Sequence, residues 1–531
     1  MRILNTQVLI IGGGVTGTGI ARDLALRGVK CILAEYRDIN AGASGGNHGL
    51  LHSGARYVAH DAAAAAECRQ EGELLKRMAG NCIEDTGGLY VAVQGDDENY
   101  VADFPHMCAR CSISARSLDV KDARRLEPAL SDQLIAAYEV PDASIDPFKL
   151  SLENIAHARR LGSTLLRNTR VVGFRMDGKR LASARLLNIL TGEEITVEAE
   201  QVANAAGAWA GEVASMAGIS LGMIFSKGTM LVTHNRISRR VLNRLRPPSD
   251  ADIIVPGGTV SILGTTSVNI DSLDDIRPTV EETDLIVSQG AQMIPELETT
   301  RYIRAYAGVR PLPGYQDKNE GRKVSRGFAL LDHVQDGLDN FATITGGKLT
   351  TFRFMAEKVS DLICRRLNVT QPCLTNLEPL PSDDGSRWTE PGLAAKLWMK
   401  QTDPSDLLLC ECEMVPKSAV DEIVADIVRQ NGRANLKAIG LRSRIGKGPC
   451  QGTFCSARVA AHLYEKGQLE AGEGLEQLKE FLRARFKGQH AILWNGQLVQ
   501  AELMEALHCG LFGLELENTK TGSALGRGTK K

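Results

Sequence analysis

The sequence predicts an α/β protein with three parts: a doubly wound nucleotide-binding domain, an antiparallel β domain inserted into it, and a small helical domain. Three observations predict this organisation. A buried strand runs into a glycine-rich turn and a helix near the N-terminus. Strand-forming runs dominate residues 221–329, and four closely spaced cysteines lie among short helical segments after residue 406. At 531 residues, the chain is long enough for more than one domain.

The first strand and helix carry a dinucleotide-binding motif. Residues 8–11 are an apolar run typical of a buried parallel strand, and Gly12-x-Gly14-x-x-Gly17 follows directly. We expect Gly12 to make a tight turn, Gly14 to let a pyrophosphate approach, and Gly17 to let the helix pack on the strand. The helix N-terminus supplies free N–H groups for phosphates. Glu35, 18 residues after Gly17, is spaced to accept the hydroxyls of an adenosine ribose.

Three further segments are rich in small residues, as expected where backbone passes close to a flat ligand. Residues 36–60 form a glycine-rich loop that also carries histidines and a basic side chain. Residues 201–210 read as a strand that enters a tight Ala-Ala-Gly turn, and residues 341–353 as a strand that passes through Gly-Gly-Lys into a helix. Backbone N–H groups at the last junction favour an anion. Each segment taken alone is also compatible with an ordinary turn.

Composition excludes several classes of protein. The hydrophobic fraction of 43% and charged fraction of 24% are those of a soluble globular protein, and the net charge of −2 gives no reason to expect nucleic acid as a partner. The sequence contains no run of about 20 apolar residues, so we expect no segment that spans a membrane. The first strand begins within a few residues of Met1, which leaves no room for a signal peptide, so we expect a cytoplasmic protein. Twelve cysteines in a reducing compartment then indicate metal or redox chemistry rather than a disulfide framework.

The same patterns predict the domain boundaries. Residues 371–406 are rich in Pro, Ser, Asp and Gly and read as a linker. The remaining units are residues 1–370 as an oxidoreductase domain (nucleotide-binding segments at about 1–80, 145–220 and 330–370; substrate segments at about 81–144 and 221–329), 407–465 as a cysteine domain, and 466–531 as a helical extension and tail.

The cysteines after the linker are candidate metal ligands. Cys410-x-Cys412 is followed 38 residues later by Cys450 and then by Cys455, in two loops bounded by short helices. Four thiolates from two loops can bind zinc or an iron–sulfur cluster. Zinc sites more often use C-x-x-C pairs, so this spacing is unusual for zinc. A redox domain in the same chain also needs a one-electron acceptor, which favours a [2Fe–2S] cluster. Zinc and unligated cysteines remain the alternatives.

These motifs together resemble a known family. Residues 12–23, 47–57, 307–312 and 345–353 are similar to FAD-dependent glycerol-3-phosphate dehydrogenases. The four-cysteine segment narrows the resemblance to the A subunit of the anaerobic, three-subunit form, whose tail resembles the [2Fe–2S] domain of bacterioferritin-associated ferredoxin (BFD). The resemblance covers nearly the whole chain. It implies a glycine-oxidase-like (DAAO-like) FAD domain, an antiparallel substrate domain and a small helical BFD-like domain.

The resemblance also implies a function. It implies oxidation of sn-glycerol 3-phosphate to dihydroxyacetone phosphate by hydride transfer to FAD, with electrons leaving through a [2Fe–2S] cluster. The partners implied are a second subunit, together with a membrane-associated iron–sulfur subunit that passes electrons to a quinone. The chain would then be cytoplasmic and peripheral on the inner face of the cell membrane.

Site residues are carried over from the matching motifs. Arg310 matches the family's substrate or phosphate arginine, and Arg56 and Lys348 match its other cations near the substrate; arginine suits phosphate because its guanidinium is a bidentate donor. A neutral histidine is the natural base for the substrate hydroxyl. His52 is the candidate, with His48 and His234 as competitors. The predicted FAD-binding residues are Gly12, Gly14, Gly17, Glu35, Ser44, Asn47, Ala206, Gly207, Gly346, Gly347, Lys348, Leu349 and Thr350.

One position departs from the family pattern, and two other functions remain open. Thr265 and Thr266 match a Gly-Thr-Thr motif, but Ser267 stands where many relatives carry Asp. The first alternative function is an amino-acid or hydroxyproline dehydrogenase α-subunit, which would bind a carboxylate instead of a phosphate. The second is an FAD-binding electron-transfer subunit without substrate turnover of its own.

Overall fold

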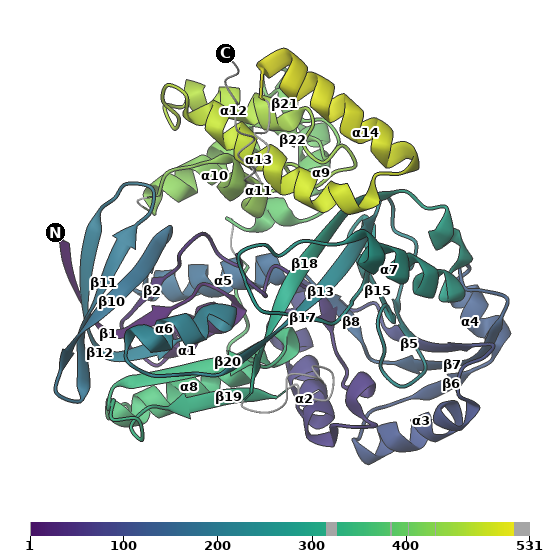
Figure 1. Ribbon diagram of the computed structural model, residues 1–531, viewed down its shortest axis with the longest axis horizontal. Helices are drawn as coiled ribbons and strands as arrows, with labels where there is room; N and C mark the ends of the chain where they lie inside the picture. The colour runs from purple at the N-terminus through teal and green to yellow at the C-terminus, as the bar shows by residue number, and fades with distance from the viewer. Residues whose placement is uncertain (1, 315–326, 383–384, 402, 431, 515–531) are drawn as a thin grey trace, which may run out of the picture.

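The glycine motif lies at the centre of an eight-stranded sheet (Figure 1). Strand β1 (Arg2–Ile11) is parallel to β2 (Cys31–Ala34) on one side and to β12 (Glu194–Asn204) on the other. The strand order is β10-β11-β12-β1-β2-β9, with β20 (Phe341–Gly346) pairing with β12 and β19 (Phe328–Asp332) pairing with β20. Residues 8–11 of β1 are fully or almost fully buried because the sheet is covered on both faces. The structure, a computed structural model, describes residues 2–314, 327–382, 385–401, 403–430 and 432–514.

Helices cover both faces of this sheet. Helix α1 (Val15–Leu26) packs between α5 (Pro147–Arg160) and α8 (Phe352–Arg366), and the three helices bury one face. Helix α6 (Ala210–Met216) packs on the other face, where the antiparallel strands β10 (Thr169–Asp177) and β11 (Arg180–Asn188) extend the sheet. The predicted doubly wound α/β arrangement is therefore observed.

A nine-stranded sheet forms the second layer of the body. Its order is β17-β13-β16-β15-β14-β5-β7-β6, and β18 (Tyr302–Pro313) pairs antiparallel with β13 (Met223–Thr233) along almost its whole length. The prediction of an antiparallel sheet needs one correction. β14 (Val241–Arg244) runs parallel to β5 (Gly88–Val93); the two strands are far apart in the chain, so no hairpin forces them to be antiparallel.

The remaining strands and helices connect or cover these layers. The other strands of the two large sheets are β6 (Arg116–Leu118), β7 (Leu134–Val140), β9 (Thr164–Leu166), β15 (Ile253–Gly257), β16 (Val260–Gly264) and β17 (Val268–Ile270). A three-stranded sheet contains β3 (Leu50–Leu51), β8 (Ala143–Ile145) and β4 (Ile83–Glu84). The helices that cover the second sheet and its edges are α2 (Ala62–Met78), α3 (Glu98–Arg110), α4 (Val120–Leu126) and α7 (Val280–Met293).

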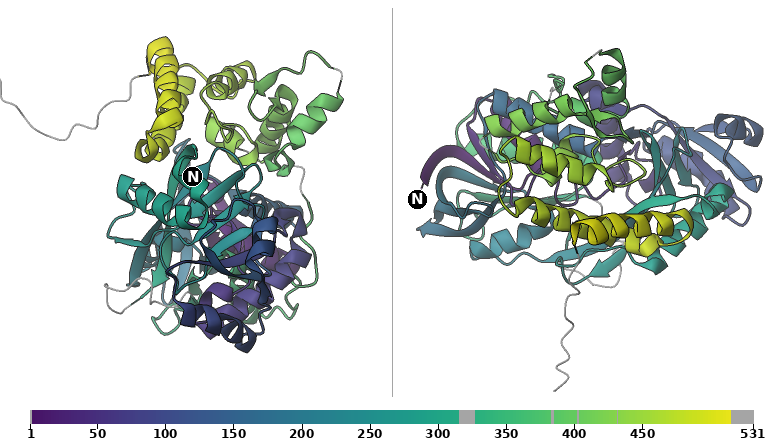
Figure 2. Two further views of the ribbon diagram at one scale, coloured as in Figure 1. Left: turned by 90° about the vertical axis from the view of Figure 1, so that its right-hand side faces the viewer. Right: turned by 90° about the horizontal axis from the view of Figure 1, so that it is seen from above.

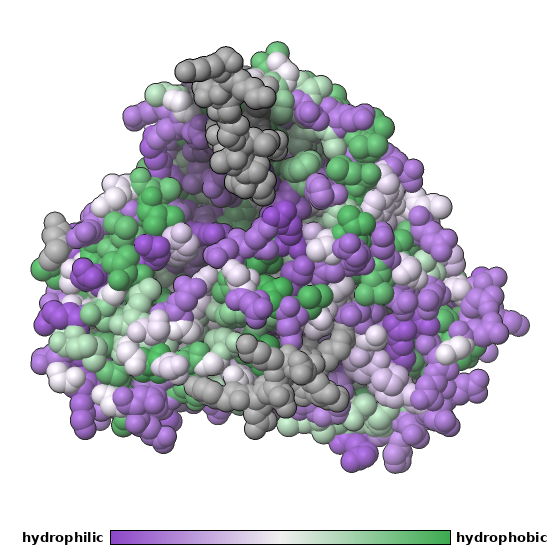
Figure 3. Space-filling view, in the orientation of Figure 1, coloured by the Kyte–Doolittle hydropathy of each residue, from purple (hydrophilic) through white to green (hydrophobic). Residues whose placement is uncertain are grey.

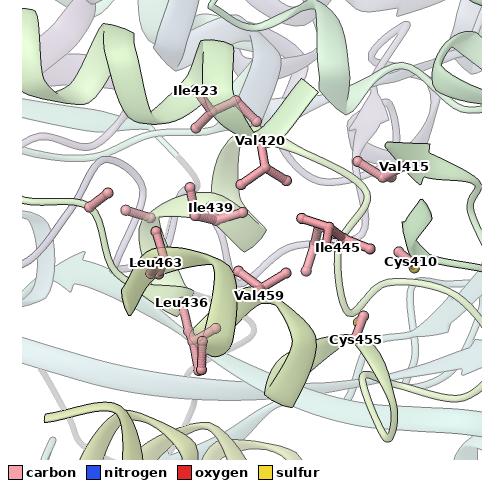
Figure 4. Close-up of a cluster of buried hydrophobic side chains, with 14 of the residues drawn as sticks. Cys410, Val415, Val420, Ile423, Leu436, Ile439, Ile445, Cys455, Val459 and Leu463 are labelled. Carbon is pink, nitrogen blue, oxygen red and sulfur yellow. The ribbon is translucent and has the colours of Figure 1, made fainter. Parts of the chain in front are cut away.

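A helical domain stands above the two sheets as a separate lobe (Figure 2). It contains a short β21–β22 hairpin (Leu408–Cys410, Val415–Pro416) and its own hydrophobic core. Its helices are α9 (Leu393–Lys400), α10 (Lys417–Arg429), α11 (Leu436–Arg442), α12 (Cys455–Glu465), α13 (Glu473–Gln489) and α14 (Asn495–Glu505). Figure 4 shows the centre of this core, with Cys410 and Cys455 among its buried side chains.

The boundaries of this domain differ from the predicted ones. Trp388 and Ala394, inside the predicted linker 371–406, are buried in the helical core, so the second half of that segment belongs to the domain. Residues of the predicted extension, including Phe481 and Met504, are buried in the same core. The sequence did not predict these contacts, because the segment is rich in proline and polar residues. Its buried residues are isolated apolar side chains, which give no hydrophobic period. The predicted tail after residue 514 lies outside the described residues.

Ion pairs fix the helical domain to the nucleotide-binding sheet. Arg442 at the end of α11 donates two hydrogen bonds to Asp38, at 2.9 and 3.0 Å, and Arg167 lies 3.3 Å from the same carboxylate. Arg442 and Arg167 hold the pKa of Asp38 down to about 2 despite its burial. The surface between the two lobes is largely hydrophilic in the view of Figure 3. Within the described ranges, no helix is both long and apolar enough to cross a membrane.

Candidate functional site

The turn after β1 has the backbone geometry that the glycine motif predicts. Gly12 has a φ of +109°, and a Cβ atom there would lie 2.5 Å from the carbonyl oxygen of Ala205 at the end of β12. A Cβ atom on Gly17 would lie 1.9 Å from the carbonyl oxygen of Gly12, so only glycine lets α1 pack this closely on the turn. The Ser44 hydroxyl accepts a hydrogen bond from the N–H of Val15, the first residue of α1, at 2.9 Å.

Glu35 closes the same turn. One carboxylate oxygen accepts from the N–H of Gly13 at 2.6 Å, and the other accepts from the N–H of Arg37 at 2.8 Å. Burial raises the pKa of Glu35 although both N–H groups favour its charged form. The carboxylate is therefore held in a fixed position at the end of β2.

A cavity of about 910 Å³ lies between the two sheets. Its volume is at the upper end of the range for cofactor and ligand sites. All but two of the predicted FAD-binding and catalytic residues line it, and they come from both sheets. Gly17 lies beneath the turn, and the buried Thr350 accepts a hydrogen bond from the His52 N–H at 3.1 Å. The predicted residues that line the cavity are Gly12, Gly14, Glu35, Ser44, Asn47, His52, Arg56, Ala206, Gly207, Arg310, Gly346, Gly347, Lys348 and Leu349.

The histidine-containing loop is held against β18. The Tyr306 hydroxyl donates to the carbonyl oxygen of Asn47 at 2.7 Å, and a Cβ atom on Gly308 would lie only 1.9 Å from the carbonyl oxygen of Gly46. The Asn47 side chain donates to the Ser44 carbonyl oxygen and accepts from the Gly49 N–H. Asn47 therefore orders the loop with its side chain.

The three predicted cations differ in their partners. Arg56 donates to the fully buried carboxylate of Asp252 at 3.0 Å, and this pairing raises the arginine's pKa against the effect of burial. The Lys348 ammonium lies 4.9 Å from the centre of the Tyr57 ring, a cation–π distance.

The guanidinium of Arg310 contacts hydroxyl groups and a carbonyl oxygen. It donates to the Thr266 carbonyl oxygen at 3.2 Å and to the Thr265 hydroxyl, and its Nη1 lies 3.5 Å from the Ser226 hydroxyl. Ser267, the position that departs from the family pattern, is hydrogen-bonded to Ser226 at 3.0 Å. A Cβ atom on Gly228 would lie 2.6 Å from the guanidinium, so this glycine leaves room for it.

Two neutral histidines lie among these cations. Burial, Arg310 and Arg56 lower the pKa of His48 to about 3, and burial with His48, Arg56 and Lys348 lowers that of His52 well below 6.5. The two rings lie 6.2 Å apart. Nδ1 of His48 accepts the N–H of Leu50 at 3.2 Å, so its remaining nitrogen carries the proton in the neutral ring.

The contacts of His52 and His234 distinguish these two candidates from each other. Among the described residues, the His52 ring makes aromatic contacts but no hydrogen bond, which leaves a lone pair for a ligand. His234 lies outside the cavity, with its Nδ1 at 3.3 Å from the carbonyl oxygen of Arg301. The geometry therefore favours His52 over both competitors as a proton acceptor.

The four predicted cysteines meet as two pairs. The sulfur atoms of Cys412 and Cys450 lie 3.2 Å apart, and the thiols of Cys410 and Cys455 are hydrogen-bonded to each other. Hydrogen bonds from Cys412 and from the backbone N–H groups of residues 452–454 lower the pKa of Cys450 to about 6. Cys455 likewise lowers the pKa of Cys410. Over the ranges that the structure describes, no three His, Cys, Asp or Glu side chains form a group that could hold a metal ion.

Several residues that shape the site carry no sequence signal. Asp252 is 196 residues from its partner Arg56, and Gly228 reads only as part of a strand. Tyr57 lies inside the predicted loop, and its contact with Lys348 depends on the fold of both sheets. The chain has many acidic residues, and nothing in the sequence marks Asp252 as the one that pairs with Arg56.

Comparison with known proteins identifies the family. A family model described as "FAD dependent oxidoreductase" matches residues 7–361. The chain is 42% identical to the A subunit of the anaerobic glycerol-3-phosphate dehydrogenase of Escherichia coli (strain K12), over 97% of this chain and 98% of that protein. It is 35% identical to the A1 subunit of the anaerobic glycerol-3-phosphate dehydrogenase of Haloferax volcanii, over 94% of this chain and 90% of the relative.

Solved structures share the fold at lower identity. The glycerol-3-phosphate dehydrogenase from Bacillus halodurans, complexed with FAD, aligns with a TM-score of 0.62 at 21% identity, over 91% of this chain and 95% of that one. Glycine oxidase from Bacillus cereus aligns with a TM-score of 0.55 at 20% identity, over 71% and 99%. The expected glycine-oxidase-like architecture is confirmed. The chain therefore belongs to the FAD-dependent oxidoreductase family and, within it, to the group of anaerobic glycerol-3-phosphate dehydrogenase A subunits.

Proposed function

We propose that the protein oxidises sn-glycerol 3-phosphate to dihydroxyacetone phosphate with FAD as the hydride acceptor. The observation that carries this proposal is that three cations and two neutral histidines line the same cavity as the glycine turn. The names of the relatives support the same substrate. In a dye-coupled assay, we expect turnover with glycerol 3-phosphate and none with hydroxyproline. The opposite preference would favour the amino-acid dehydrogenase alternative.

FAD fits the residues that line the cavity. The turn at Gly12 and the N-terminus of α1 are suited to the pyrophosphate, and Glu35 to the adenosine ribose. Gly346 and Gly347, with φ of +81° and +72°, form a turn before α8 that lines the cavity, where the flavin ring would lie. When bound, FAD supplies a two-electron acceptor for the hydrogen on C2 of the substrate.

Arg310 is the proposed phosphate ligand. It lines the cavity beside the Thr265 hydroxyl, whereas the guanidinium of Arg56 is directed at the carboxylate of Asp252. A planar guanidinium also gives a phosphate two parallel hydrogen bonds. Arg56 and Lys348 then stabilise the alkoxide that develops as the hydroxyl loses its proton.

Replacing Arg310 by alanine is expected to raise KM for glycerol 3-phosphate. The loss of a charge-assisted contact of about 1.5–3 kcal/mol corresponds to about 10–100-fold in kcat/KM. Arg310→Lys should lose less, because the ammonium keeps the charge without the fork. Steady-state kinetics with a dye acceptor measure both variants, and an unchanged kcat/KM for Arg310→Ala would remove this residue from the substrate site.

His52 is the proposed general base. Its ring is neutral and makes no hydrogen bond to any described residue, so it can accept the proton of the C2 hydroxyl. His48 is better suited to donate from its Nε2, since its Nδ1 already accepts a backbone N–H. The pair would thus combine a proton acceptor with a hydrogen-bond donor near the reacting carbon.

The pH dependence of kcat follows from the lowered pKa of His52. A histidine base works only when neutral, and the neutral form persists at every pH above its folded pKa. Because this pKa lies well below 6.5, we expect kcat to stay within about twofold between pH 7.5 and 5.5. A histidine with a pKa near 6.5 would lose about 90% of its neutral form at pH 5.5. A tenfold fall of kcat over this range would contradict the assignment.

The cysteines are the proposed ligands of a [2Fe–2S] cluster. Such a cluster takes four thiolates, and the observed arrangement offers two pairs. Backbone N–H groups directed at Cys450 are the kind of donor that stabilises thiolate sulfur. We propose that Cys410, Cys412, Cys450 and Cys455 hold the cluster and that the helical domain is BFD-like. Zinc instead of iron in the purified protein would overturn this assignment.

The proposed partners are further subunits of the same enzyme. The relatives are named as A subunits, which implies further subunits. We propose a second subunit, together with a membrane-associated iron–sulfur subunit that takes electrons from the cluster and passes them to a quinone. The protein would then lie in the cytoplasm, held peripherally at the inner face of the membrane through these subunits.

A further inference from the structure

Two arginines from different domains meet beside the cysteines. Arg304 lies on β18 of the nine-stranded sheet, and Arg485 lies on α13 of the helical domain. A Cβ atom on Gly488, three residues after Arg485, would lie 3.2 Å from the Arg304 side chain, so α13 packs directly on this part of β18. The Arg485 guanidinium lies against the loop of Cys450: it donates to Gln451, the next residue, at 3.2 Å, and a Cβ atom on Gly446 would lie 2.8 Å from it. Its charge interacts with Arg304, Cys450 and Cys455.

These arginines lack acidic partners. Within the described part of the chain, neither has a carboxylate oxygen within 4.0 Å, and Nε of Arg304 is buried without a hydrogen bond. Among the described residues, Arg485 donates to the side-chain oxygen of Gln451 at 3.2 Å and lies 4.8 Å from the centre of the Phe481 ring.

Two other arginines near the cysteines are fully paired. Arg444 lies 2.9 Å from Glu413, and Arg458 lies 2.8 Å from Glu411. Arg304 and Arg485 therefore differ from these neighbouring arginines in having no acidic partner among the described residues.

Half-buried like charges without a counter-charge are unfavourable, because each loses hydration and repels the other. Burial and Arg304 lower the pKa of Arg485 to about 9, while the nearby thiols act in the opposite direction. An anion beside Cys450 and Cys455 would attract Arg485 and offset its repulsion with Arg304. A [2Fe–2S] cluster is such an anion, since its four thiolates and its bridging sulfides together outweigh the charge of the irons, and reduction adds one more negative charge.

We propose that Arg485 and Arg304 raise the reduction potential of the [2Fe–2S] cluster by stabilising its reduced, more negative form. This inference rests on the proposed cluster. Net charge around an iron–sulfur cluster is one of the factors that set its potential. The two arginines thus act on electron transfer through their charge, at a distance from the proposed substrate site.

Strand β18, which carries Arg304, also connects the cysteine domain with the proposed substrate site. Arg304 and Arg310 lie on the same strand, about 20 Å apart for six residues of extended chain. One strand therefore carries a cation to Arg485 in the cysteine domain and another to the proposed substrate site. Arg304 can be varied without changing the cysteine loops, and Arg485 without changing the cavity.

The test is a redox titration of the cluster in the full-length protein, followed by its visible absorbance or electron paramagnetic resonance. At a fixed solution potential, Arg485→Met should lower the ratio of reduced to oxidised cluster about tenfold. This corresponds to a fall of about 59 mV in the reduction potential of a one-electron couple. Arg485→Lys should restore most of the shift. Arg483→Met is the matched control, because Arg483 is exposed on the same helix and the change in net charge is identical. We expect its potential to equal that of the wild type.

Iron and flavin are measured on each sample. If Arg485→Met does not retain iron, Arg304→Met, on the other domain, decides by the same titration. Wild-type potentials in both variants, with iron retained, would overturn the role of the arginines and leave the cluster intact. A wild-type protein without iron would overturn both the cluster and this inference.

Discussion

Replacing His52 by asparagine is expected to lower kcat for glycerol 3-phosphate about 100- to 10,000-fold, the usual contribution of a general base. Asparagine keeps a polar side chain at the cavity but cannot accept the proton. The substrate's phosphate would still meet Arg310, so KM should change little. The measurement is the rate of flavin reduction in a single anaerobic turnover, which excludes later electron-transfer steps.

The matched control is His48→Asn. His48 also lines the cavity and is also neutral, but its Nδ1 holds the backbone N–H of Leu50. Losing a donor instead of the base should cost less, about 10- to 100-fold. If His48→Asn proved the more damaging change, the two histidines would have the opposite roles, and His52 would not be the base.

Replacing Cys412 by serine is expected to abolish the iron–sulfur absorbance and all cluster-dependent electron output, while glycerol 3-phosphate still bleaches the flavin. Serine is a poor iron ligand, and Cys412 forms one of the two observed thiol pairs. The flavin cavity lies between the two large sheets and contains none of the four cysteines. The variant should therefore separate the two half-reactions.

Cys509→Ser serves as the control for this loss. Cys509 lies in the same domain and donates from its sulfur to the carbonyl oxygen of Leu514 at 3.1 Å, which a serine hydroxyl can reproduce. We expect wild-type iron content in this variant. Equal iron content in Cys412→Ser and the wild type would show that Cys412 is not a ligand.

Local features of the chain could be predicted from its sequence. The close packing at Gly17 and the carboxylate of Glu35 at the end of β2 depend on residues within one β-α-β unit. Backbone conformation and hydrophobic period determine such units, and both can be read from a short window.

Contacts between distant segments could not be predicted in this way. Arg56 pairs with Asp252 across 196 residues, and Arg442 pairs with Asp38 across 404. Trp388 looked like part of a linker because its neighbours are polar, yet it is buried in the helical core. In each case the partner is chosen by tertiary packing, and the sequence offers many residues of the same type.

The central claim is that one chain combines a glycerol 3-phosphate-oxidising flavin site with an iron–sulfur exit. The most direct test is anaerobic titration of the purified protein with glycerol 3-phosphate, followed by flavin absorbance, with iron measured on the same sample. We predict that the flavin is bleached by glycerol 3-phosphate and not by hydroxyproline, with about two irons per flavin. A flavin that stays oxidised with glycerol 3-phosphate would contradict the proposed activity, and a bleached flavin in a sample without iron would contradict the proposed exit.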